Sequence, residues 1–246
     1  MSSVSTDQTT ISKVPFVTDS NGVEEIFYPT SDGKPMGETG IHIRLLLEIV
    51  QTLSTFYEND KETYVIGDIL MYFVEGKPKK FVVPDVMVIK GIGNQERRSY
   101  KIWEEKKSPD VIFELSSLGT WHNDLYKKFD LYEELGVKEY YVFDPDYDYL
   151  PKPLIGYHLI KGKFENVAVE NKRIYSPIMN LFLVDTNKTL RFFNPETNDF
   201  LPTRQELAYK TDELAKETKE LATKTEELES ENKRLKAELE KLKKQT

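Results

Sequence analysis

The sequence predicts an α/β fold in which a mixed central sheet is flanked by helices and followed by one long C-terminal helix. Segments of helical and strand-like periodicity alternate along residues 33–203. Apolar residues make up 39% of the 246-residue chain, which is enough to build a core. A leucine repeat of period seven fills residues 204–246. The order of the elements by itself also allows an α+β arrangement.

The elements follow from local patterns along the chain. Residues 1–32 are rich in Ser, Thr, Asp and Gly and are expected to form a flexible arm. Apolar side chains along one face predict helices over residues 40–57 and 124–135, the second closed by Gly136 in the left-handed conformation. The polar residues 91–108 predict a loop or lid. Residues 63–74 predict one long strand or a bent pair broken at Gly67, and residues 81–89 predict a strand interrupted by Pro84. Further strands are expected at residues 111–115, 138–143, 154–159, 164–169, 181–184 and 190–193.

Two of the apolar strands each carry a carboxylate. Asp85 follows Pro84 inside residues 81–89, and Glu114 lies inside residues 111–115. A carboxylate among apolar neighbours is costly to bury without a partner. Two carboxylates at the mouths of adjacent strands provide the oxygen ligands that Mg²⁺ requires. Simple pairing with lysines at the strand ends is the alternative interpretation.

A lysine on the next helix completes this candidate site. Lys128 lies one turn after Asp124 and on the same helix face, where it can orient an attacking water or help to deprotonate it. Lys127 is a rival, rotated by about 100° around the helix. Asp110 follows another proline and competes with Asp85, but it lies at the entrance of its strand.

The ordered set of motifs resembles one known family. The motifs are VPDVMV at 83–88, SPDVIFELSS at 108–117, DLYKK at 124–128 and GVKEYYVFDP at 136–145, preceded by GKPMGET at 33–39. This order is similar to that of the Uma-family restriction endonucleases of bacteria, a branch of the PD-(D/E)XK nuclease superfamily. The resemblance implies a restriction-endonuclease-like core and hydrolysis of DNA phosphodiesters that depends on Mg²⁺ or Mn²⁺.

The resemblance also assigns roles to residues. Asp85 and Glu114 match metal ligands, and the backbone carbonyl of Leu115 is implied as a further ligand. The usual lysine two residues after the second carboxylate is replaced by Ser116, and Lys128 stands where this family carries its lysine. If Lys128 does not reach the reacting water, the site is expected to bind metal but to cut slowly or not at all.

An acidic residue on the first helix often completes such sites. Glu38 matches it, and Glu48 on the same helix is the alternative. His42 is expected to be structural or to hydrogen-bond to Glu38.

The charge distribution qualifies the DNA prediction. The chain carries 34 basic and 42 acidic residues, a net charge of −8, which argues against a general nucleic-acid binder. Residues 76–107, however, hold nine basic and four acidic residues and surround Asp85 in the sequence. This segment predicts local, salt-sensitive contact with DNA, and a solvated loop is the alternative. The candidate contacts are Lys79, Lys80, Arg97, Arg98 and His122.

Composition excludes several other chemistries. The chain has no Cys, so a disulfide framework, a thiolate zinc site and a cysteine nucleophile are excluded. It has three His, too scattered to predict a histidine metal site. An apolar run long enough to span a membrane and a signal-peptide pattern are both lacking, so a cytoplasmic protein without membrane contact is expected.

Residues 204–246 predict a coiled coil. The leucines recur at Leu207, Leu214, Leu221, Leu228, Leu235 and Leu242. With leucine at heptad position d, position a is mostly polar and includes Asn232, a pattern typical of a parallel dimer. The prediction is a homodimer that pairs two catalytic domains, and a lone solvated helix is the alternative.

Two functions therefore compete. The first is a metal-dependent endonuclease, with RNA or another phosphodiester as an alternative substrate. The second is a binding or scaffold protein with the same fold, which has a weak or inactive site and acts through its coiled coil.

Overall fold

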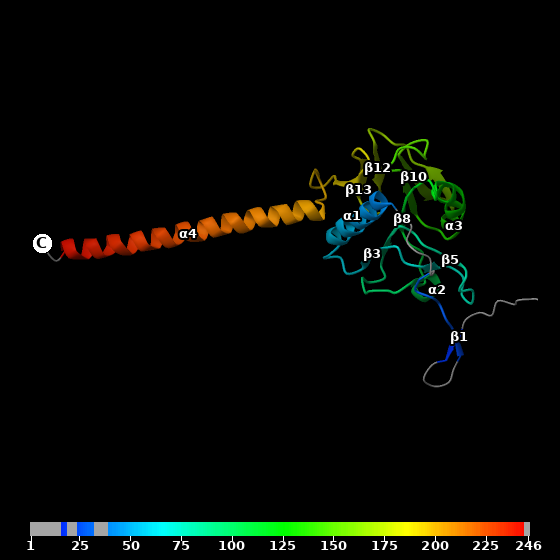
Figure 1. Cartoon of the computed structure of the whole chain (residues 1–246), viewed down its shortest axis with the longest axis horizontal. Coiled ribbons are helices and arrows are strands. Elements are labelled where there is room, and N and C mark those ends of the chain that lie inside the picture. Colours follow the sequence, from blue (N-terminus) through cyan, green and yellow to red (C-terminus); the bar gives the residue numbers. More distant parts are fainter. Residues whose placement is uncertain (1–15, 19–23, 32–38, 244–246) are drawn as a thin grey trace, which may run out of the picture. The chain divides into compact units, whose positions relative to one another are not determined.

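The computed structural model describes residues 16–18, 24–31 and 39–243. The chain divides into two compact units, residues 1–201 and 202–246. The first unit contains a mixed central sheet with helices, and the second contains one long helix (Figure 1). The predicted fold class is therefore confirmed.

The first unit is organised around a six-stranded sheet. Its strands are β3 (Thr63–Gly67), β6 (Val86–Lys90), β8 (Val111–Leu115), β9 (Glu139–Phe143), β10 (Leu154–Ile160) and β11 (Lys163–Asn166). They lie in the order β11-β10-β9-β8-β6-β3. Strands β8 and β9 are parallel and the other neighbours are antiparallel. A parallel pair requires a long crossover, and the helical segment after β8 provides it.

Alternating side chains of these strands build an apolar core on each face of the sheet. In β6, Val86 belongs to one core and Met87 to the other. The first core includes one face of α1 (Gly40–Phe56), and the second includes side chains of the crossover helices. A four-stranded antiparallel sheet contributes to the first core. Its strands are β12 (Arg173–Ser176), β13 (Leu181–Asp185), β14 (Leu190–Asn194) and β15 (Asp199–Phe200).

The two longest β-rich segments are both broken. Residues 63–74 form β3 and β4 (Met71–Tyr72), and residues 81–89 fall into β5 (Phe81–Val82) and β6. The break after β5 falls at Pro84 and Asp85. Proline interrupts the strand because it lacks the N–H that a strand interior needs. Asp85 therefore lies between two strands rather than within one.

The prediction of a loop or lid over residues 91–108 is wrong in part. This segment contains β7 (Tyr100–Lys101), which pairs in parallel with β4, and the short helix α2 (Ile102–Glu105). Tyr100 is fully buried, and its hydroxyl donates to the carbonyl of Lys107 at 2.8 Å. The buried ring anchors a segment whose polar composition had indicated a free loop.

The N-terminal arm also contains structure. Strands β1 (Phe16–Thr18) and β2 (Glu24–Ile26) pair antiparallel. The ring of Tyr28 packs 5.0 Å from that of Tyr72, whose hydroxyl donates to the carbonyl of Pro29 at 2.5 Å. The end of the arm is therefore attached to the first unit.

The crossover helix is less regular than its periodicity predicted. It begins as a π-helix, η1 (Asn123–Lys128), and continues as α3 (Phe129–Glu134). Gly136 adopts φ +76°, as expected for the left-handed residue that ends a helix. Short π-helical segments inside helices often lie at functional sites. Here the π turn contains Asp124 and ends at Lys128.

The second unit is the helix α4 (Arg204–Lys243). Its start follows from a reciprocal capping box. The backbone N–H of Glu206 donates to the hydroxyl of Thr203 at 3.2 Å, and the N–H of Thr203 donates to the Glu206 carboxylate at 2.8 Å.

Gly67 packs against the backbone of Asp85, so a substitution at position 67 tests this packing. A Cβ at position 67 would lie 2.4 Å from the carbonyl oxygen of Asp85 and 3.0 Å from a methyl of Val50. We expect Gly67→Ala to lower the free energy of unfolding by about 1–3 kcal/mol, measured by urea denaturation. Gly119→Ala is the control, because nothing lies within 4 Å of its Cβ position. Equal stability of the two variants would contradict this packing.

Candidate active site

Glu114 is the most buried charged group of the site. It lies on β8, and its side chain is enclosed by the crossover helix. The ammonium of Lys128 donates to its Oε2 at 2.7 Å, and the hydroxyl of Tyr132 donates to its Oε1 at 2.7 Å. Burial raises the pKa of Glu114 well above its usual range, against the opposing effect of Lys128.

Lys128 is the lysine that enters the site. Its side chain is 13% exposed and lies 2.7 Å from Glu114 and 3.3 Å from Oδ1 of Asp124, whereas Lys127 is exposed. Burial alone would lower the pKa of Lys128, but the charges of Glu114, Asp124 and Asp85 raise it above its usual value. The amine is therefore an ammonium at neutral pH.

Asp85 reaches the same end of β8 from the break between β5 and β6. Its Oδ2 accepts the backbone N–H of Leu115 at 2.6 Å, so it is tied to the residue that follows Glu114. Its Oδ1 lies 3.3 Å from Nε2 of His42, and its side chain is 17% exposed. Burial would raise the pKa of Asp85, but His42, the charge of Lys128 and the Leu115 N–H lower it.

The sequence did not predict the contact between His42 and Asp85. His42 is buried on α1, and its backbone N–H donates to the N-cap hydroxyl of Thr39 at 3.2 Å. The expected partner, Glu38, lies outside the described residues. Glu48 is partly buried on α1. The i, i+3 relation between Thr39 and His42 was a signal for the cap, but nothing local points from His42 to Asp85, 43 positions later.

Asp124 and Ser116 complete the cluster. Asp124 is buried, and its Oδ2 accepts the hydroxyl of Ser116 at 3.2 Å. Its Oδ1 faces Lys128 at 3.3 Å without forming a hydrogen bond. Burial raises the pKa of Asp124. Ser116 therefore supports the carboxylate beside the helix lysine. The sequence placed Asp124 and Lys128 on one helix face but did not predict that Tyr132 contacts Glu114, although its spacing of four residues from Lys128 is a signal for the same face.

The donor set suits a hard divalent cation. Three carboxylates, Asp85, Glu114 and Asp124, surround the single ammonium of Lys128, so the cluster carries excess negative charge when they are ionised. Each oxygen of Glu114 accepts one hydrogen bond and keeps a second lone pair. Within the described ranges, no group of three or more ligating side chains is already arranged around a cation position. Mg²⁺ is nevertheless often held by one or two carboxylates with several waters.

Asp110 has a different role from Asp85. It lies just before β8, at the opposite end from Glu114. Its carboxylate accepts from Lys138 at 2.6 Å and from the backbone N–H of Lys90 at 2.8 Å, and it lies 3.1 Å from the ammonium of Lys107. Burial would raise the pKa of Asp110, but these partners lower it. Asp110 therefore fixes the start of β8.

The five candidate DNA contacts differ in their exposure to solvent. Lys79, Lys80 and Arg98 are exposed. His122 is exposed beside the crossover helix, with its ring stacked 3.5 Å from Trp121.

Arg97 does not meet the expectation of a DNA contact. Its side chain is 6% exposed, and its guanidinium donates to both carboxylate oxygens of Glu105. The remaining donors are taken by the carbonyls of Gly93, Gln95 and Ile92. All five N–H groups of a guanidinium are thereby used, so Arg97 organises its own loop and has none left for a phosphate.

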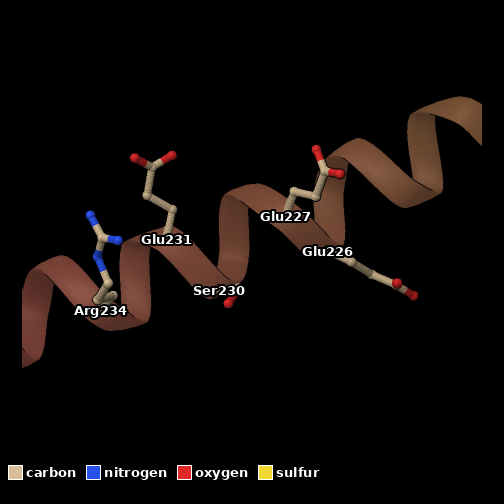
Figure 2. A pocket seen from close by; sticks show the side chains of 5 residues that line it. All are labelled: Glu226, Glu227, Ser230, Glu231 and Arg234. Atoms are coloured by element: carbon tan, nitrogen blue, oxygen red, sulfur yellow. The ribbon is translucent and has the colours of Figure 1, made fainter.

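A surface hollow also lies along α4. It is lined by Glu226, Glu227, Ser230, Glu231 and Arg234 (Figure 2). These side chains all project from one exposed helix. The lining contains no apolar side chain and none of the carboxylates of the central sheet. The hollow is not the candidate active site.

These features define the protein as an α/β domain of nuclease type. The family model described as "Putative restriction endonuclease" (Uma2) matches residues 28–173, and the chain belongs to this family. The resemblance inferred from the motifs is thereby confirmed.

The chain also resembles proteins of known structure. The chain is similar to a crystal structure described as "a putative nuclease belonging to DUF820" from Anabaena variabilis ATCC 29413. The sequence identity is 17% and the TM-score 0.44, over 61% of this chain and 81% of that chain. No curated protein matches the chain. Among the described residues, no helix is long and apolar enough to span a membrane.

Lys128 and Lys127 form a matched pair for a stability test. Lys128→Met removes the ammonium from buried Glu114, so we expect a loss of about 3–5 kcal/mol at neutral pH. The pKa of Glu114 is raised in the fold, so the loss shrinks as pH falls toward about 4, where the carboxyl is protonated in both states. Lys127→Met should change stability by about 0.5 kcal/mol or less. Denaturation at several pH values measures both, and equal losses would contradict the assignment.

Asp110 predicts a second pH effect. Its pKa is lowered in the fold, so its stabilisation is present above about pH 4 and is lost as pH falls through the native value. Asp110→Asn should therefore cost about 2–3 kcal/mol at pH 7 and less at acid pH. Exposed Asp148 is the control position for Asp→Asn. A cost that stays constant with pH would contradict this assignment.

Proposed function

We propose that the chain is a divalent-cation-dependent endonuclease that hydrolyses phosphodiester bonds in DNA. Membership of the restriction endonuclease family supports a nuclease in general. The proposal of cation-dependent cleavage is based on the convergence of Asp85, Glu114 and Lys128 at one end of β8. Residues from three separate segments meet there through direct contacts.

The acidic side chains would hold the cation. Asp85, Glu114 and the carbonyl of Leu115 supply hard oxygen ligands, and Mg²⁺ or Mn²⁺ suits such a set. When bound, the cation supplies Lewis-acid activation of water and offsets charge on the phosphate. The Leu115 N–H and His42 orient Asp85, and Tyr132 orients Glu114.

Lys128 contributes positive charge in this proposal. The charges of three carboxylates raise the pKa of Lys128, which favours an ammonium that donates a hydrogen bond to the nucleophile or the phosphate. Its contacts with Glu114 and Asp124 hold the ammonium in place from the helix side. The lysine therefore replaces in function the one missing at Ser116.

Cleavage of plasmid DNA tests this proposal. With Mg²⁺ or Mn²⁺ present, Asp85→Asn, Glu114→Gln and Lys128→Met should each lower the cleavage rate by roughly 10²–10³-fold, because each loses a ligand or a charge at the reacting phosphate. Lys127→Met should cleave like the wild type. Wild-type activity in the Asp85 or Glu114 variant would sink the assignment. Circular dichroism of each variant separates a lost site from a lost fold.

DNA binding should depend on exposed basic residues of the first unit. We propose Lys79, Lys80, Arg98 and His122 as DNA contacts. Arg98→Ala should weaken binding and reduce the slope of log affinity against log salt by about 1, measured by fluorescence anisotropy. Arg97→Ala should instead lower stability, because it leaves the partly buried carboxylate of Glu105 and three backbone carbonyls without their donor. An unchanged salt slope in the Arg98 variant would contradict its assignment.

A second function, binding without cleavage, is favoured by one observation. Both oxygens of Glu114 are engaged by Lys128 and Tyr132, and burial favours the protonated carboxyl. A site that stays closed in this way would bind cations weakly. Isothermal titration with Mg²⁺ decides between the functions, because heat that disappears in Glu114→Gln supports the endonuclease. The absence of binding in the wild type supports the scaffold.

A further inference from the structure

The helix α4 carries an uncovered apolar stripe. Leu214, Leu221, Leu228 and Leu235 occupy the d positions, and Leu239 occupies an a position. These five leucines are 45–62% exposed. The other faces of α4 are mostly charged, so leucine forms its one continuous apolar surface. A helix of this kind buries its stripe against a partner.

The polar residues beside the stripe form hydrogen bonds within their own helix, which lowers the cost of burying them. The hydroxyls of Thr211, Thr218 and Thr225 donate to carbonyls one turn earlier, at 2.9, 2.7 and 2.8 Å. A hydroxyl that is satisfied within its own helix can enter an interface without an orphaned donor. The side-chain amide of Asn232 donates to the carbonyl of Leu228 at 3.0 Å and keeps one N–H and its oxygen for a partner.

The flanking charges identify the partner. In a parallel, in-register pair of identical helices, each g residue meets the e residue five positions later on the other helix. Lys224 then meets Glu229, Glu231 meets Lys236, and Glu238 meets Lys243. All three pairs are of opposite sign, and the two-fold axis repeats each of them. The two earlier g residues of the helix meet Ala215 and Ala222 at the e positions. Alanine carries no charge, so these pairs add no repulsion.

An antiparallel pair of the same helix is less favourable. With full overlap, g residues face g residues. Glu217 then meets Glu238, and Lys224 meets Glu231, so attraction and repulsion cancel. Asn232 would face Leu221 and leave its amide unpaired in the seam, whereas in the parallel pair it meets its own copy.

We propose that α4 pairs with α4 of a second copy of this chain, parallel and in register, and that Asn232 and the three charge pairs set this register. Both copies of α4 then begin at the same end, about 8–10 Å apart. In an antiparallel pair the two starts would be separated by roughly 60 Å, the length of a 40-residue helix. Placing two domains at one end suits two nearby cuts in a duplex, a consequence that rests on the proposed function.

Charge reversal tests the register on the full-length chain. The first variant carries Glu231→Lys and Glu238→Lys, and the second carries Lys236→Glu and Lys243→Glu. In either homodimer four pairs become repulsive, so dissociation constants should rise by about 10²-fold, since each exposed pair contributes a few-fold. An equimolar mixture restores every pair and should give a heterodimer of wild-type affinity. Analytical ultracentrifugation and native mass spectrometry measure both results.

The matched control reverses charges on the outer face. Glu226 projects from the opposite side of α4 to Glu231 (Figure 2). Glu226→Lys combined with Glu240→Lys changes the net charge as much as the first variant but should leave dimerisation unchanged. A monomeric wild type, a control as weak as the first variant, or a mixture that does not form heterodimers would each overturn the proposal. None of these measurements requires nuclease activity.

Cysteine crosslinking tests the orientation separately. The chain has no Cys, so a single introduced thiol reports one position. In the parallel pair, Leu214→Cys faces its own copy and should form a disulfide-linked dimer on mild oxidation. In the antiparallel pair, position 214 faces position 239, so only a mixture of Leu214→Cys and Leu239→Cys would crosslink. That second outcome would overturn the parallel arrangement.

Discussion

The buried ion pair between Glu114 and Lys128 is the interaction on which the candidate site depends. It joins the central strand β8 to the crossover helix, and Tyr132 binds the other carboxylate oxygen from the same helix. Removing the ammonium leaves the carboxylate of Glu114 buried without a cation, which costs more than the pair contributes. The fold therefore keeps a basic group beside an acidic group that would not be stable alone.

The rest of the site is arranged around this pair through the backbone of β8. The N–H of Leu115 binds Asp85, and the hydroxyl of Ser116, just after β8, binds Asp124, so consecutive residues at the end of this strand position three carboxylates. The pKa values of Asp85 and Glu114 move in opposite directions, because Asp85 has His42 and a backbone N–H as partners while burial dominates at Glu114. Carboxyl groups with divergent pKa values at one location are typical of functional sites.

Much of the fold could be predicted from local patterns. The α1 helix, the strand β8 and the long C-terminal helix appear within a few residues of their expected bounds, because each has a strong period or a clear cap. The π-helical start of the crossover and the folded segment around Tyr100 were not predicted. Both depend on buried contacts with residues distant in sequence, and composition does not record such contacts.

Composition limits the residue types that this protein can use for chemistry to carboxylates and a lysine, without cysteine and with few histidines. The sequence also determined the heptad pattern of α4, because that pattern is a property of one continuous segment. The contacts of three other residues follow from tertiary packing. Lys128 rather than Lys127 faces Glu114, His42 contacts Asp85, and Arg97 binds groups of its own loop. These choices depend on the direction in which side chains point after distant segments pack, and local periodicity constrains only the face of an element, not its partner.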